Sequence, residues 1–180
     1  MSQSVKKRLA DSLEQLMETQ SLPKITISNI VAVGKLSRQS FYNNFLDIYD
    51  LIQWTHAEHI QYAIDLFWEN EDFCESFKMA LLSLQEHKSF YQNVIQKDNG
   101  LFFRDSFALR QVDLCNVHIK QIACKAPDPD TDFLLKLYWY GTADMLVQWI
   151  SKGMKEDPAV LAQLFYKGLP VPLQKYWPKI

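Results

Sequence analysis

The chain has 180 residues, 48% of them hydrophobic and 13% aromatic, which excludes a disordered protein and is enough to bury a core. A formal net charge of −2 excludes a generally basic nucleic-acid-binding protein, so any contact with DNA has to come from a local patch. Three cysteines without CxxC spacing argue against a disulfide framework or a structural zinc site, and we therefore expect a reducing compartment, the cytoplasm.

The first predicted element is an amphipathic helix, with charged residues outside its apolar stripe. The stripe consists of Val5, Leu9, Leu13, Leu16 and Met17. Pro23 then ends the helix.

Residues 25–51 predict two short helices joined by a tight turn and followed by a longer helix. The hydroxyl of Thr26 can cap the first short helix and that of Ser37 the second, while Gly34 permits the turn between them. Phe41 and Phe45 lie one turn apart and are expected to point inward. A short helix anchored by two aromatic rings, with a hydrogen-bonding outer face, suits a DNA groove. We therefore predict a homeodomain-like, three-helix helix-turn-helix unit as the first domain, residues 1–46.

Residues 47–180 predict a second domain, a C-terminal helical bundle for dimerisation and effector binding. A long helix covers about residues 47–70, and three apolar stripes at helical spacing follow between residues 71 and 123. A last helix is expected over residues 157–168, with Pro near its start and Gly at its end. The tail, residues 170–180, carries three prolines and is expected to be irregular. The predicted fold class is all-α, with about nine helices in total.

The segment 133–152 is apolar nearly all round. A helix without a polar face is buried on more than one side, and in a chain this small we assign the second side to another copy of the chain. Lys136 and Asp144 interrupt the segment, so we expect no membrane span. The predicted dimer interface consists of Tyr140, Gly141, Asp144, Val147, Gln148, Leu161 and Phe165.

These segments match one family. The run ITISNI, the segment SRQSFYNNF and the DIYDLI start of the long helix resemble the TetR/AcrR family of bacterial transcriptional regulators. Within it, RQSFYNNFLDIYDLIQW looks most like the branch of dihydroxyacetone-kinase operon regulators, and YxxGxxxMLxxWIxxG at residues 138–153 is similar to the C-terminal domain of that branch. The resemblance implies an all-α homodimer that binds a palindromic operator with two recognition helices about one DNA turn apart. It also implies dimerisation through the last two long helices and a small-molecule pocket.

The outer face of the second short helix is the candidate DNA-binding surface. Arginine can fork onto guanine and glutamine onto adenine, so Arg38 and Gln39 are candidates for reading bases. The resemblance implies a phosphate contact for Tyr42. The predicted DNA-binding residues are Lys24, Thr26, Lys35, Ser37, Arg38, Gln39, Ser40, Tyr42, Asn43 and Asn44.

Local charge leaves an alternative open. The cluster Lys6-Lys7-Arg8 could add phosphate contacts, but the first 50 residues carry six basic and five acidic side chains. Ile48 stands where the family often has lysine. The alternative is a ligand-sensing or protein-interaction module on the same fold, with weak or lost DNA binding.

The aromatic residues of the second half either line an effector cavity or only pack a core. The candidate pocket residues are His59, Phe67, Phe77, Phe103, Phe107 and Tyr138. The effector is expected to be a small molecule or a protein co-regulator.

We expect a regulator rather than an enzyme, because the sequence shows no nucleophile–base motif and no phosphate loop. No cofactor is expected. His56 and His59, with Glu58 between them, lack a third metal ligand at a convincing spacing, so no metal site is predicted. His87 and His118 are expected to be solvated or locally bonded.

Overall fold

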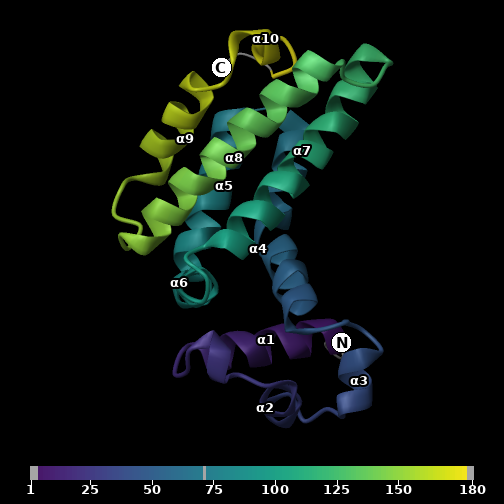
Figure 1. The fold of residues 1–180 in the computed structure, drawn as a ribbon, viewed down its shortest axis with the longest axis vertical. Coiled ribbons are helices and arrows are strands. Elements are labelled where there is room, and N and C mark those ends of the chain that lie inside the picture. The colour runs from purple at the N-terminus through teal and green to yellow at the C-terminus, as the bar shows by residue number, and fades with distance from the viewer. Residues whose placement is uncertain (1–3, 71, 178–180) are drawn as a thin grey trace.

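The computed structural model describes residues 4–70 and 72–177, and these residues form helices without strands (Figure 1). The elements are α1 (Val5–Met17), the 3-10 turn η1 (Leu22–Lys24), α2 (Ile27–Val33), α3 (Arg38–Tyr42), α4 (Ile48–Asn70), α5 (Phe73–Glu86), α6 (Lys88–Gln96), α7 (Leu101–Ala123), α8 (Pro129–Ser151), α9 (Pro158–Lys167) and α10 (Val171–Gln174). The all-α class is confirmed, with ten α-helices in the described residues against about nine expected. The ends of both predicted domains, residues 1–3 and 178–180, and the helix start expected at residue 71 lie outside the described residues.

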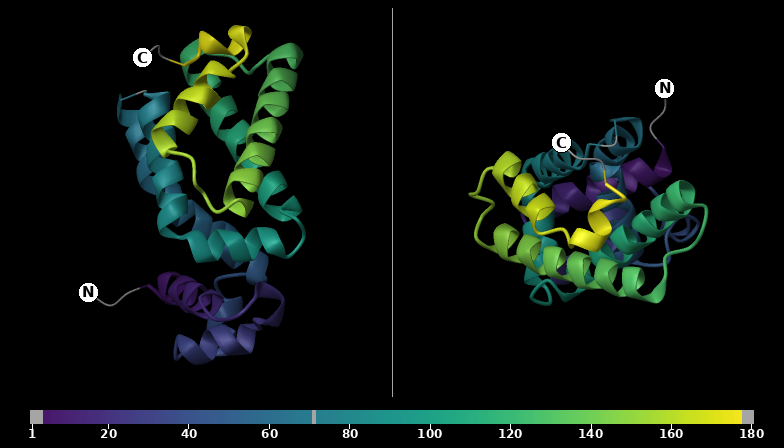
Figure 2. Two further views of the ribbon diagram at one scale, coloured as in Figure 1. Left: turned by 90° about the vertical axis from the view of Figure 1, so that its left-hand side faces the viewer. Right: turned by 90° about the horizontal axis from the view of Figure 1, so that it is seen from above.

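Two groups of helices meet at α4 (Figure 1). The N-terminal unit, α1 to α3, lies at one end of the molecule, and α5 to α10 gather around the far part of α4, as Figure 2 shows from two further directions. Within the C-terminal bundle α7 packs along α8, and α5 packs against both α4 and α9. Because α1 also packs against α4 and α6, direct helix contacts hold the N-terminal unit on the bundle.

The short helices of the N-terminal unit begin where the sequence predicts. The Thr26 hydroxyl accepts a hydrogen bond from the backbone N–H of Asn29, and the Asn29 side chain accepts one from the backbone N–H of Thr26, which makes a capping box. The Ser37 hydroxyl accepts from the backbone N–H of Ser40 at 3.0 Å. Both predicted caps are confirmed. Each satisfies a backbone donor that a helix of five to seven residues would otherwise leave free.

The turn between α2 and α3 does not use Gly34 as predicted. Gly34 has φ −72°, which any residue adopts, and the left-handed residue of the turn is Lys35, with φ 50°. Gly34 matters instead for close approach, because a Cβ atom there would lie 2.9 Å from the hydroxyl oxygen of Ser12 on α1. The side chain of Arg8 ties the same turn to α1 by donating to the carbonyl oxygen of Gly34 at 2.5 Å.

Two aromatic rings anchor α3, as predicted. Phe41 is completely buried and Phe45 is 3% exposed, with their ring centroids 6.0 Å apart. Burying each ring contributes about 1.5–3 kcal/mol, which is large for a helix of only five residues. The helix ends at Tyr42, so Phe45 lies beyond it, but its backbone N–H still donates to the carbonyl oxygen of Phe41 at 2.9 Å.

Helix α8 has two different faces within one chain. Leu135, Leu146 and Ile150 are buried on α7 and its neighbours, whereas Phe133 and Leu137 are 65% and 60% exposed. The side of α8 that carries these exposed rings and methyl groups lacks a partner within the described residues. None of the helices in residues 4–70 and 72–177 is long and apolar enough to cross a membrane.

The tail was expected to be irregular, and this is wrong for its described part. Residues 171–174 form the short helix α10, and Leu173 and Trp177 are buried. The carbonyl oxygen of Tyr176 lies 2.8 Å from Nε2 of His118 on α7. Buried apolar contacts therefore order a proline-rich segment whose local sequence suggests a loop.

Candidate DNA-binding, ligand and dimer sites

The predicted DNA-binding residues share one open surface on α2, α3 and the segments beside them. Their side chains are exposed except those of Ser40 and Asn44, which are half-buried. Tyr42 is 50% exposed. The surface therefore remains free of the chain's other described helices, as a groove-binding helix requires.

Hydrogen bonds set the starting positions of several of these side chains. Nε2 of Gln39 donates to Oδ1 of Asn43 at 2.8 Å, and Nη1 of Arg38 donates to the Ser28 hydroxyl at 3.4 Å. These are exposed contacts along and between α3 and α2, so base edges or phosphates can replace them at small cost. The hydroxyls of Thr26 and Ser37 act as helix caps.

The basic cluster at the start of α1 contributes less free charge than expected. Lys7 pairs with Asp11 at 3.0 Å, and Arg8 donates to the carbonyl oxygens of Gly34 and Lys35. Lys6 lies over the ring of Phe45, 5.5 Å from its centroid. Arg8 thus positions the turn before α3.

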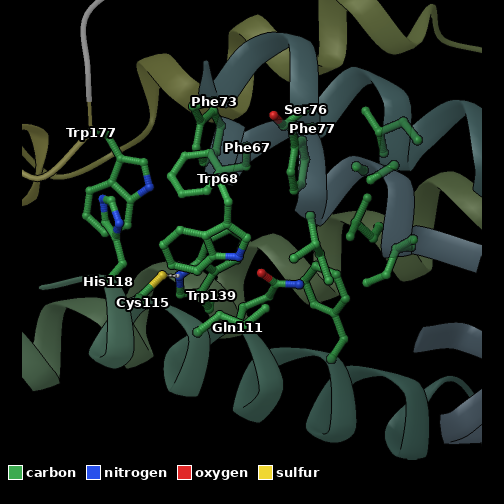
Figure 3. Close-up of a pocket in the computed structure, with 18 of the residues that line it drawn as sticks. Phe67, Trp68, Phe73, Ser76, Phe77, Gln111, Cys115, His118, Trp139 and Trp177 are labelled. Atoms are coloured by element: carbon green, nitrogen blue, oxygen red, sulfur yellow. Dashed lines mark hydrogen bonds between the residues drawn. The ribbon is translucent and has the colours of Figure 1, made fainter. Parts of the chain in front are cut away.

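A cavity of about 100 Å³ lies inside the C-terminal bundle, among α4, α5, α7, α8 and the tail (Figure 3). Of the predicted pocket residues, Phe67, Phe77 and Phe107 line it. His59, Phe103 and Tyr138 do not, and the Tyr138 hydroxyl instead donates to the carbonyl oxygen of Phe165 at 2.8 Å. The lining residues that sequence reasoning did not select include Trp68, Gln111, Cys115, His118, Trp139 and Trp177.

The chemistry of this cavity is mostly apolar. Its walls are aromatic and aliphatic, and its polar side chains include Ser76, Gln111 and His118. The Ser76 hydroxyl oxygen is buried without a hydrogen-bond partner in the described residues. Burial raises the pKa of the Cys115 thiol to about 12, and Trp139 donates to its sulfur at 3.1 Å, so Cys115 packs as an unreactive thiol.

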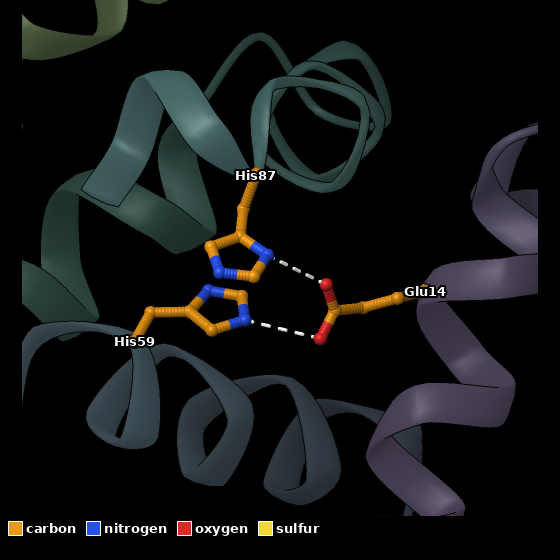
Figure 4. Close-up of side chains that lie close together, drawn as sticks. All are labelled: Glu14, His59 and His87. Atoms are coloured by element: carbon orange, nitrogen blue, oxygen red, sulfur yellow. Dashed lines mark hydrogen bonds and ion pairs between the residues drawn. The ribbon is translucent and has the colours of Figure 1, made fainter. Parts of the chain in front are cut away.

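His59 and His87 occupy a site that neither was assigned. The carboxylate of Glu14 on α1 is hydrogen-bonded to Nε2 of His59 at 3.0 Å through one oxygen and to Nδ1 of His87 at 2.8 Å through the other (Figure 4). The two imidazole rings stack, with centroids 3.5 Å apart and planes 9° apart. The expectation that His87 is solvated or locally bonded is therefore wrong, since its partner lies 73 residues away.

The protonation of this cluster follows from its surroundings. Burial alone would raise the pKa of Glu14, but the hydrogen bonds from His59 and His87, and the positive charge of these rings when they are protonated in acid, outweigh burial and hold it below its usual 4.5. Burial lowers the pKa of His59 below 6.5, although Glu14 opposes this shift. At neutral pH an ionised carboxylate thus accepts a hydrogen bond from a neutral His59 ring.

Glu14, His59 and His87 are also the group of described residues whose metal-ligand atoms lie within 4.8 Å of one another. A metal ion needs ligand lone pairs that converge on it. The stacked rings are almost parallel, so their in-plane lone pairs run side by side instead. The geometry fits a carboxylate held by two imidazoles better than a metal centre.

The predicted dimer residues separate into two sets. Gly141, Asp144 and Gln148 are exposed on α8, while Tyr140 and Leu161 are half-buried. Val147 contacts the chain itself, because a Cβ atom at Gly100 would lie 2.5 Å from it. Phe165 likewise packs on Phe77, with ring centroids 5.2 Å apart. The large exposed apolar side chains of α8 and α9, which are outside the predicted set, are Phe133, Leu137, Met145, Val160 and Leu164.

Comparison with known proteins gives matches in sequence and in fold. The model of the family described as "Transcriptional regulator C-terminal region" matches residues 71–169. The chain is 33% identical over 104 residues to the HTH-type dhaKLM operon transcriptional activator DhaS of Lactococcus lactis subsp. lactis (strain IL1403); the match covers 54% of this chain and about half, 53%, of that relative.

Solved structures of similar fold cover nearly the whole chain. The dihydroxyacetone kinase operon activator DhaS superposes with a TM-score of 0.65 at 20% identity, over 97% of this chain and 98% of that one. The fatty acid degradation regulator FadR from Bacillus halodurans has a TM-score of 0.57 at 16% identity, over 94% and 96%. The TetR family repressor AlkX from Dietzia sp. Strain DQ12-45-1b has a TM-score of 0.53 at 14% identity, over 96% of both chains.

Proposed function

The chain belongs to the TetR family of transcriptional regulators, and from this premise we propose that it binds a palindromic DNA operator as a homodimer. The observation that carries the proposal is the open polar surface of α3, held outward by the buried rings of Phe41 and Phe45. Arg38 and Gln39 are its base-reading residues, and Tyr42, Lys24 and Lys35 supply phosphate contacts. The regulators named above are alike in fold, and one is alike in sequence.

The exposed apolar sides of α8 and α9 support the homodimer. Phe133, Leu137 and Met145 on α8, with Val160 and Leu164 on α9, are each 54–65% exposed in one chain. A two-fold interface would bury this apolar surface against its own copy. Asp144 and Gln148, exposed on the same helix, would hydrogen-bond at that interface.

The aromatic cavity is the proposed effector site. Phe67 and Trp68, which line the cavity, belong to α4, and the other end of α4 adjoins the N-terminal unit. A small apolar ligand that prefers one position of α4 would shift the population of dimers between DNA-competent and incompetent states. The effect on DNA affinity cannot exceed the ratio of the ligand's affinities for the two states.

Weak or lost DNA binding remains the second candidate, favoured by one observation. Lys7 and Arg8 are engaged by Asp11 and by turn carbonyls, which leaves few free charges beside α3. Under this alternative the same fold senses a ligand or binds a protein co-regulator.

A fluorescence-polarisation titration separates the two candidates. Labelled duplexes from the DNA upstream of the protein's own gene are titrated at several salt concentrations, beside a shuffled duplex of equal composition. We expect saturable binding of two chains per palindrome, weakening as salt rises. Equal affinity for the shuffled duplex, or no binding at low salt, supports the alternative.

A further inference from the structure

A second cavity, of about 250 Å³, lies between α4, α6 and α7, apart from the aromatic cavity described above. Its walls include four aromatic side chains, Phe90, Tyr91, Phe102 and Phe103. The polar groups that matter are His56 of α4 and Arg110 of α7, so we name it the His–Arg cavity.

Both polar groups present an atom without a partner. Nε2 of His56 and Nε of Arg110 are buried and make no hydrogen bond within the described residues. No carboxylate of the described residues lies within ion-pair distance of the Arg110 guanidinium. Leaving a buried polar atom unpaired costs free energy, so these two atoms of one cavity are groups that a bound ligand would satisfy.

Arg110 sets the charge of that ligand. A guanidinium stays protonated and only donates hydrogen bonds, and its planar fork matches a carboxylate. Elsewhere on α7 the chain does pair its arginine, since Nε of Arg104 lies 3.1 Å from Oδ1 of Asp105. Arg110 therefore selects an anion that the chain itself does not supply in its described part.

The hydrogen-bond chain behind His56 sets the second requirement. The Tyr91 hydroxyl lies between Nδ1 of His56, at 2.9 Å, and Nδ1 of His59, at 3.1 Å, and it has one proton to give. Nε2 of His59 donates to ionised Glu14, so its Nδ1 is bare and accepts the Tyr91 proton.

The Tyr91 oxygen must then accept a proton from Nδ1 of His56. A neutral ring with its proton on Nδ1 presents a bare lone pair at Nε2. Burial, with the nearby charges of His59 and Arg110, lowers the pKa of His56 to about 3, which keeps the ring neutral. The ligand group that meets His56 must therefore be a donor, such as a hydroxyl.

We infer that the His–Arg cavity binds a small aromatic hydroxycarboxylate, with its carboxylate on Arg110 and its hydroxyl donating to Nε2 of His56. The aromatic walls pack on the ring of the ligand. Because Tyr91 and His59 connect His56 to Glu14 on α1, an occupied cavity also holds this hydrogen-bond chain in one tautomer. The inference concerns ligand binding and stands independently of DNA binding.

Isothermal titration calorimetry on the full chain tests it with the three monohydroxybenzoates, benzoate and phenol. Benzoate lacks the hydroxyl and phenol lacks the carboxylate. We expect one hydroxybenzoate to bind at least about tenfold more tightly than either. Phenol loses the charged contact with Arg110, and benzoate leaves the buried Nε2 of His56 without a donor. Equal affinity for benzoate and all three hydroxybenzoates, or no heat with any probe, overturns the inference.

Variants assign the site. Arg110→Gln is expected to weaken the preferred hydroxybenzoate at least about tenfold, whereas Arg104→Gln, which removes the same charge from the same helix, leaves it unchanged. In ¹⁵N NMR of the histidine rings, the ligand should move the Nε2 signal of His56 in the unmodified protein, which needs no variant to fold. If Arg110→Gln still binds the preferred hydroxybenzoate tightly and the ligand does not move the His56 signal, the assignment is overturned.

Discussion

The carboxylate of Glu14 on α1 accepts a hydrogen bond from Nε2 of His59 on α4 across 3.0 Å, joining residues 45 positions apart in the chain. His87 adds a second bond at 2.8 Å, and Asn93 of α6 bonds both the carbonyl oxygen of Met17 and the backbone N–H of Leu22. The N-terminal unit is therefore attached to the bundle by specific polar contacts as well as by α4. Any movement between the two has to break or shift these bonds.

Removal of the Glu14 carboxylate should loosen this attachment. Glu14→Ala leaves the partly buried His59 and His87 without their acceptor, and we expect a loss of about 1–3 kcal/mol in the free energy of unfolding. Urea denaturation measures the loss. Gln15→Ala, a neighbouring exposed position on α1, is the matched control. Equal stability of the two variants would show that the cluster contributes nothing.

Stability should fall as the medium becomes acidic. The folded pKa of His56 is about 3 and its ordinary value 6.5, so between these values the unfolded chain binds a proton that the folded chain does not. The free energy of unfolding is therefore full above pH 6.5 and decreases below it by about 1.4 kcal/mol per pH unit for one such group. His59, whose pKa is also lowered, acts in the same direction.

Glu14 extends the same trend to lower pH. Its folded pKa lies below 4.5, so its contribution is present above that value and is lost as pH falls through the folded pKa. Chemical denaturation at pH 7.5, 6.5, 5.5 and 4.5 measures the contribution of the histidines, and a further point at about pH 3.5 measures that of Glu14. A free energy of unfolding that rises between pH 7 and 5 contradicts these shifts.

A methyl group at Gly34 should destabilise the N-terminal unit. It would lie 2.9 Å from the Ser12 hydroxyl oxygen, which is bonded to the carbonyl oxygen of Arg8 at 2.6 Å, so Ser12 has to rotate and give up that bond. We expect Gly34→Ala to cost about 1–2 kcal/mol. Gly168→Ala is the control, because its added methyl group meets only ordinary contacts at 3.5 Å. Thermal unfolding of the two variants decides whether the close approach matters.

Charge on the exposed apolar sides of α8 and α9 should separate the proposed dimer. Leu137 is 60% exposed and Leu164 is 55% exposed in one chain. Leu137→Asp and Leu164→Asp each place a carboxylate at a position that the proposed dimer would bury. Size-exclusion chromatography with light scattering should find a dimer for the parent chain and monomers for both variants. Val171→Asp, at a 77% exposed position on α10, should remain dimeric. A monomeric parent chain at micromolar concentration is the contrary result.

Local sequence signals predicted the local structure well. The caps Thr26 and Ser37 and the buried pair Phe41 and Phe45 depend on residues within one or two helical turns, and the structure confirms each. Gly34 shows the limit of such reasoning. The position needs a glycine because Ser12 on another helix leaves no room for a Cβ atom. The DNA-binding set stays a prediction, placed on an open surface.

Long-range contacts could not be read from spacing. Glu14 of α1, His59 of α4 and His87 at the junction of α5 and α6 meet from distant parts of the chain, and Trp177 reaches the aromatic cavity from a proline-rich tail. Helical periodicity marks an apolar face without saying which cavity it lines or whether it ends in solid packing. Phe103 lines the His–Arg cavity rather than the aromatic cavity, and Tyr138 lines neither of them. Val147 and Phe165 satisfied the interface pattern and yet pack within the chain.

The central claim is that the outer face of α3 binds DNA, and one titration tests it most directly. Polarisation of a labelled duplex from upstream of the gene is measured for the parent chain, Arg38→Ala, Tyr42→Ala and the exposed control Gln96→Ala. We predict that Arg38→Ala and Tyr42→Ala each weaken binding, Arg38→Ala by about 5- to 150-fold from the loss of one base contact, with circular dichroism unchanged and Gln96→Ala like the parent. If all three variants bind the duplex with the affinity of the parent chain, the account is contradicted.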